Sequence, residues 1–121
     1  MERTNFEDLR VYQLAECLAD SVWEDVMRWS ILARDTVGKQ LIRAADSIGA
    51  NVAEGSGRGS VIDNRRFVRI ARGSLYETRH WLRRAFRRNL LKSEQINSLK
   101  ETLDELTRVL NGYLSSLSTK N

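Results

Sequence analysis

Apolar residues recur at alternating intervals of three and four along most of the chain, and this spacing restricts the fold more than any other feature. The clearest run lies near the C-terminus and forms a heptad seam. It consists of Ile96, Leu99, Leu103, Leu106, Leu110, Tyr113 and Leu117. Three earlier segments repeat the helical period, and no segment alternates for long in the manner of a strand. The spacing predicts an all-α protein.

Four helices are expected, over residues 8–28, 36–54, 62–88 and 94–117, joined by short links. Long helices with short connections favour an antiparallel up-down four-helix bundle. The chain of 121 residues suits one domain, with no internal repeat and no linker, so residues 1–121 are predicted to form a single four-helix-bundle domain. The apolar stripe of the first helix is wider than one seam, which suggests a second buried face against another subunit.

Positive charge is concentrated in one segment. Residues 58–92 contain 11 Lys or Arg against 2 Asp or Glu, and ten of those cations are arginine. On a helical wheel most of them align along one face of the predicted third helix, roughly 30 Å long. The candidate binding residues are Arg58, Arg65, Arg66, Arg69, Arg72, Arg79, Arg83, Arg84, Arg87 and Arg88. The opposite side is apolar and includes Phe67, Ile70 and Trp81, which are predicted to enter the core.

The arginine face favours a nucleic-acid partner. Most of its arginines lack an acid three or four residues away, so they repel one another unless acids of the first or second helix fold over them or a polyanion compensates. Guanidinium groups bind phosphate through two hydrogen bonds, and we expect RNA or DNA binding that weakens steeply with salt. The alternatives are a partner protein with an acidic face, or simple solvation. A membrane surface is not expected, because the apolar side of this helix is needed for the core.

The stretch "AEGSGRGS", residues 53–60, resembles a phosphate-binding loop only superficially. Such a loop follows a strand and ends in Gly-Lys-Ser/Thr, and neither feature is present. We expect Gly55 to end the second helix with a positive φ and Ser60 to begin the third. The joint would then bring Arg58 to the same end as Arg65 and Arg66, as an anion-binding corner.

No catalytic, metal or cofactor site is predicted. The chain has one histidine, His80, and one cysteine, Cys17, too few for a His- or Cys-based metal cluster. Cys17 is expected to be a buried apolar residue. No secretory signal or membrane-spanning run is present, so a cytoplasmic location is expected.

Three motifs resemble one family. They are "FEDLRVYQLA" (6–15), "QLIRAADSIGANVAEGSGR" (40–58) and "FVRIARGSLYE" (67–77). They are similar to the four-helix-bundle proteins encoded in intervening sequences of bacterial 23S rRNA genes, to which the accessory variability determinants of diversity-generating retroelements are related. The resemblance implies a homo-oligomer, a pentameric barrel, without catalytic activity. For the retroelement branch it also implies contact with a reverse transcriptase and its RNA.

A polar stripe of the second helix matches the family signature. The stripe consists of Gln40, Arg43, Ser47, Asn51 and Glu54, of which the last four match the signature. Buried polar groups at a subunit interface would explain Arg43, Ser47, Asn51 and Glu54. The combined expectation is a non-enzymatic, homo-oligomeric nucleic-acid-binding protein that assists a reverse transcriptase. The alternative is an oligomeric protein-interaction scaffold of the intervening-sequence type that does not bind nucleic acid.

Overall fold

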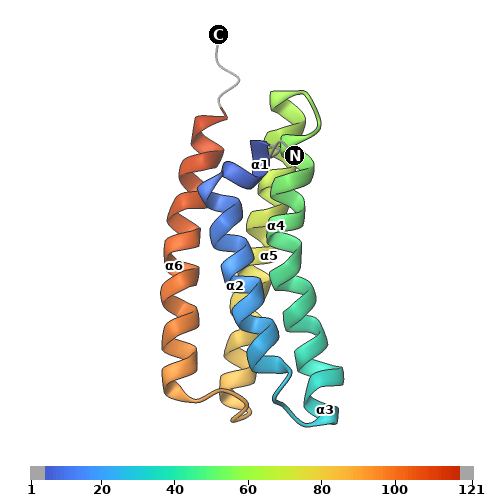
Figure 1. Cartoon of the computed structure of the whole chain (residues 1–121), viewed down its shortest axis with the longest axis vertical. Helices are drawn as coiled ribbons and strands as arrows, with labels where there is room; N and C mark the ends of the chain where they lie inside the picture. The colour runs from blue at the N-terminus through green and yellow to red at the C-terminus, as the bar shows by residue number, and fades with distance from the viewer. Residues whose placement is uncertain (1–4, 118–121) are drawn as a thin grey trace.

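Four long helices lie side by side in the computed structural model, which describes residues 5–117 (Figure 1). Each runs opposite to the one before it along the chain. They are α2 (Arg10–Val26), α4 (Lys39–Ser56), α5 (Val61–Arg87) and α6 (Ser93–Ser116). No strand occurs within residues 5–117, and the expected all-α helical bundle is confirmed.

Short helical segments precede two of the long helices. The turn α1 (Asn5–Asp8) leads into α2, while α3 (Ile31–Ala33) and the π-helical segment η1 (Arg34–Gly38) lead into α4. Helical structure therefore begins at residue 31, earlier than the expected 36. Ser30 provides the start, because its side-chain oxygen accepts a hydrogen bond from the Ala33 amide at 3.3 Å.

The π-helical segment is located where α2 and the start of α4 approach closely. A Cβ atom added at Gly38 would lie 2.6 Å from Cγ1 of Val26 and 3.2 Å from the carbonyl oxygen of Ala33. Only glycine fits at this position without a shift of its neighbours. The close approach of α2 and α4 at the lower end of the bundle in Figure 1 therefore requires a glycine at position 38.

The core is aliphatic and lies along the bundle axis. α4 packs against α2 and α5, and α6 packs against the same two helices, so the order around the bundle is α2, α4, α5, α6. The largest fully buried side chains include Leu18, Leu41, Ile48, Leu75, Leu103, Leu106 and Leu110. Trp81 is half-buried against this core. Phe67 is also half-buried, and the guanidinium groups of Arg58 and Arg66 lie over its ring. Ile70, in contrast, is 44% exposed, so its predicted place in the core is wrong.

The joint between α4 and α5 differs from its prediction. Gly55 is buried inside α4, which continues to Ser56, and the C-cap Gly57 has a φ of −89°. The positive φ of this joint belongs to Gly59, at +82°. Gly55 is small for a packing reason, because a Cβ there would lie 2.7 Å from Oδ1 of Asn64 and 2.9 Å from Cβ of Phe67. Ser60 begins α5 as expected, with its hydroxyl accepting from the Asp63 amide at 3.0 Å.

Among the described residues, no helix combines the length and the apolar character that crossing a bilayer requires.

Candidate nucleic-acid interface

The arginines of α5 divide into groups according to their position around the helix. Those nearest α6 reach across to it. Arg65 donates to the carbonyl oxygens of Leu114 and Leu117, at 2.9 and 2.7 Å. Arg72 donates to the Asn111 side chain at 3.3 Å. These two side chains hold α6 against α5 and have neutral partners, so their charges are not cancelled.

Arg79 is the one arginine of α5 that pairs with an acid of α6. Its guanidinium lies 3.1 Å from a carboxylate oxygen of Asp104 and donates to the Thr107 hydroxyl at 2.8 Å. Asp104 lies outside the sequence segment 58–92. It belongs to α6, a helix that was not expected to supply acids to these arginines. At Arg79 the compensating acid therefore comes from α6 and not from the first or second helix.

The arginines at the α4–α5 joint are engaged locally. Arg58 pairs with Glu54 and Arg66 pairs with Asp63, both at 3.5 Å. Both guanidinium groups also lie over the Phe67 ring, with 5.0 and 4.7 Å to its centroid. These are exposed pairs of small energetic value, so an incoming phosphate can compete for them. Arg65 is turned toward α6 instead, so the proposed anion-binding corner contains two available guanidinium groups rather than three.

The remaining arginines have no acidic partner. Within residues 5–117 no carboxylate lies at ion-pair distance from Arg69, Arg83, Arg84, Arg87 or Arg88. All but Arg84 are exposed. Three of the five lie in the last turn of α5 or directly after it, where the helix dipole favours positive charge. The unpaired positive charge is therefore concentrated toward the C-terminal end of α5.

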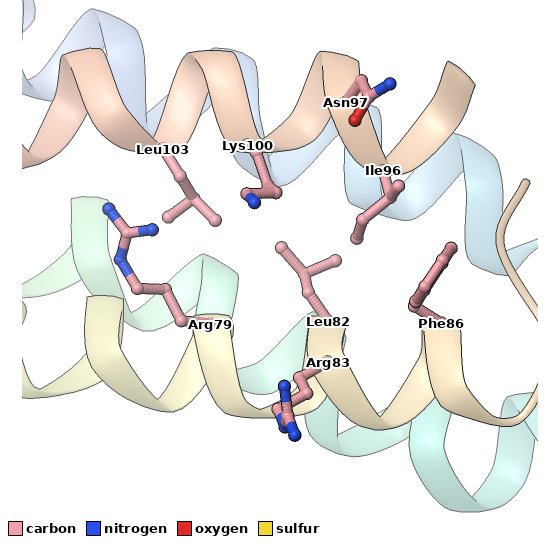
Figure 2. A pocket seen from close by; sticks show the side chains of 8 residues that line it. All are labelled: Arg79, Leu82, Arg83, Phe86, Ile96, Asn97, Lys100 and Leu103. Carbon is pink, nitrogen blue, oxygen red and sulfur yellow. The ribbon is translucent and has the colours of Figure 1, made fainter. Parts of the chain in front are cut away.

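A hollow opens beside this end, between α5 and the first turns of α6 (Figure 2). Its volume is about 440 Å³. It is lined by Arg79, Leu82, Arg83, Phe86, Ile96, Asn97, Lys100 and Leu103. Arg79 and Arg83 were predicted from the sequence, but the α6 residues and Phe86 were missed. A pairing of helices is needed to bring them together, and the wheel of one helix does not show it.

Of the predicted subunit-interface residues on α4, Ser47 and Asn51 lie at its border with α5. The hydroxyls of Ser47 and Ser74 are 2.9 Å apart, and the Asn51 amide donates to the carbonyl and hydroxyl of Ser47 at 2.8 and 3.0 Å. Contacts within one chain thus account for Ser47 and Asn51. Glu54 and Arg43 are exposed, and for these four residues the role in a subunit interface stays a prediction.

The remaining candidates for chemistry are isolated. His80 is exposed and meets Trp81 edge to face, with ring centroids 4.8 Å apart. Cys17 is exposed, so its predicted burial is wrong. The described part of the chain has no cluster of three or more His, Cys, Asp or Glu side chains arranged to hold a metal ion.

Comparison with known proteins identifies relatives of the whole bundle. The family described as "23S rRNA-intervening sequence protein" matches residues 7–112. No curated protein matches the chain. A similar solved structure is the crystal structure of a protein of unknown function from the S23 ribosomal protein family of Bacteroides thetaiotaomicron VPI-5482. It superposes with a TM-score of 0.76 at 23% identity, over 86% of this chain and 97% of the other. At that identity the likeness concerns the fold alone.

Proposed function

We propose that this chain, which belongs to the 23S rRNA-intervening sequence protein family, is a homo-oligomeric, non-enzymatic protein that binds RNA or DNA through α5. In this proposal it acts as an accessory to a reverse transcriptase of a diversity-generating retroelement. The polymerase partner is inferred from the resemblance of the three sequence motifs to the accessory variability determinants. The nucleic-acid partner is inferred from the charges of the fold.

The observation that supports nucleic-acid binding is the set of unpaired arginines on one helix. Arg69, Arg83 and Arg87 are exposed and have no acid at ion-pair distance among the described residues. Arg87 follows Arg69 by 18 positions, which correspond to about 27 Å along the helix axis. Like charges aligned in this way repel one another, and a phosphate backbone alongside them relieves the repulsion and releases counterions.

The test is the salt dependence of binding together with charge reversal. We expect RNA and DNA to bind with an affinity that falls by orders of magnitude between about 50 and 200 mM salt, as expected for several phosphate contacts. The triple change Arg69→Glu, Arg83→Glu, Arg87→Glu should abolish binding in fluorescence anisotropy. These three positions are preferable to Arg79, whose reversal would also oppose Asp104.

A matched control changes the net charge by the same amount on other helices. Arg28, Lys39 and Arg108 are exposed and lie on or beside α2, α4 and α6. Their triple change to Glu should leave most of the binding intact. If both triple variants lose binding equally, the net charge and not the α5 face is responsible; if the wild type does not bind at all, nucleic-acid binding is wrong.

The second candidate function is a protein-interaction scaffold, and an apolar patch favours it. Trp23 and Met27 at the end of α2 and Ile31 and Leu32 at the start of the next helical segment are 46–75% exposed. Exposed apolar side chains that follow one another in this way are typical of a protein contact. The test is a pull-down, in the presence of nuclease, with a reverse transcriptase encoded beside this gene. If this patch is the docking surface, the wild type should retain the reverse transcriptase and Trp23→Asp should not.

A further inference from the structure

We propose that the hollow between α5 and α6 holds one unpaired nucleobase, so that this protein binds single-stranded nucleic acid in preference to duplex. The inference rests on the nucleic-acid binding proposed above and specifies the form of the ligand. The hollow has an apolar floor and a cationic rim, and it lies beside the unpaired arginines.

The floor of the hollow is apolar and partly uncovered. Leu82 and Leu103 form its base and are 3% and 1% exposed. The Phe86 ring is 42% exposed and faces the gap toward Ile96, as Figure 2 shows. A flat ring inserted here covers apolar surface on two helices and stacks against an aromatic side chain. Every base offers such a face, which makes stacking tolerant of sequence.

The rim of the hollow is positively charged on both sides. Arg79 is fixed in place by Asp104 and Thr107. Arg83 and Lys100 are exposed and have no ion-pair partner among the described residues. In Figure 2 the Lys100 ammonium points into the gap, while the Arg83 side chain is turned away from the gap along α5. A nucleobase with its flanking phosphates complements an apolar floor with cations at its rim. A purely apolar ligand would form no ionic contact with these cations.

The geometry favours an unpaired base for an energetic reason. In a duplex each base is stacked and paired, so entry into a hollow requires it to leave the stack, which costs a few kcal/mol. A single strand does not have this cost. The Asn97 amide, the one neutral polar side chain of the lining, is turned away from the gap in Figure 2. The hollow therefore accepts a base without reading its identity.

The test compares a short single-stranded RNA with the duplex of the same sequence, by fluorescence anisotropy at one salt concentration. Phe86→Ala should weaken single-strand binding about tenfold, the usual effect of removing one stacking ring, and leave duplex binding within about twofold. The matched control is Ile70→Ala. Ile70 lies on the same helix, is 44% exposed and does not line the hollow, so neither affinity should change. Thermal melting verifies that both variants fold.

A second measurement locates the base directly. RNA carrying 5-iodouridine should crosslink to Phe86 on irradiation, and the crosslink should disappear in Phe86→Ala. Crosslinks that map only to Tyr76 or other parts of α5 would overturn the proposal.

The outcomes separate this inference from the proposed function. If RNA and DNA bind but Phe86→Ala changes neither affinity, or both equally, the hollow is not a base site and nucleic-acid binding by the arginines remains. The same conclusion holds if Phe86→Ala instead lowers the molecular mass in light scattering, because the hollow is then a contact between protein chains. If the wild type binds neither single strand nor duplex, both proposals are wrong.

Discussion

At the scale of single residues, small side chains determine how closely the helices approach. Gly55 allows the end of α4 to lie against Asn64 and Phe67 of α5. Along the same border, Ser47 and Ser74 share a hydrogen bond of 2.9 Å, and Thr78 is fully buried and donates to the Ser74 carbonyl. At this border, short polar side chains that form hydrogen bonds between or along the helices take the place of larger side chains. The α4–α5 border is therefore close-packed and sensitive to added volume.

We expect Gly55→Ala to lower the free energy of unfolding by about 1–3 kcal/mol, the usual cost of overpacking. The new methyl group would lie 2.7 Å from the Asn64 side chain and 3.1 Å from its backbone carbonyl, and the backbone cannot easily give way. Gly57→Ala is the control, because its Cβ would have only ordinary contacts at 3.7 and 3.8 Å. Urea denaturation measures both. Equal stability of the two variants would contradict the predicted clash.

At the scale of the helices, the arginines of α5 fall into two groups that the sequence does not distinguish. One side of its arginine face secures α6, and the outward part is free for a ligand. Arg65 is the clearest structural case, because it donates to the carbonyls of Leu114 in the last turn of α6 and of the C-cap Leu117. It acts as a C-terminal cap supplied by a neighbouring helix.

We expect Arg65→Ala to destabilise the protein by about 1.5–3 kcal/mol, the range for hydrogen bonds to charged groups. Hydrogen exchange should show the loss first in the last turns of α6. Arg66→Ala is the matched control, since the adjacent Arg66 is exposed and its interactions, a weak pair with Asp63 and a contact with the Phe67 ring, are local to α5. If Arg66→Ala affects α6 as much as Arg65→Ala, the capping role is wrong.

At the scale of the whole molecule, charge is distributed unevenly around the bundle. The order of the helices places α2 diagonally opposite α5. Between α2 and α4 lies a shallow hollow with small residues and the acids Glu16, Asp20 and Asp46. Burial raises the pKa of Asp46, and the charge of Asp20 adds to the effect. If the protein binds a polyanion as proposed, we therefore expect the polyanion to approach from the α5 side and to be repelled from the α2–α4 side.

The proposed homo-oligomer is tested by light scattering. We expect a mass several times that of one chain, and a lower mass for Arg43→Glu, because reversed charge at an interface opposes its former partner. Lys39→Glu provides the control one helical turn away on α4, where the residue is also exposed. A monomeric wild type, or an equal effect of the two changes, would contradict the α4 interface.

How well the sequence predicts the structure depends on how far apart in the sequence the interacting residues lie. Helix positions depend on local periodicity, so the four segments could be predicted, as could the Ser60 cap, which depends on a side chain and an amide three residues apart. Most differences arise where a second helix contributes. Ile70 has an apolar wheel position but is 44% exposed, because no neighbouring helix covers it.

The sequence by itself determined the helical period, the concentration of arginine between residues 58 and 92, and the alignment of those arginines on one face. Only the tertiary structure decided which of them remain free. Arg65 and Arg79 are held by α6, whereas Arg83 and Arg87 have no acidic partner among the described residues. The hollow beside Phe86 exists only because α5 and α6 pack together. The reason is physical: periodicity is a property of one helix, but a partner or a cavity requires two.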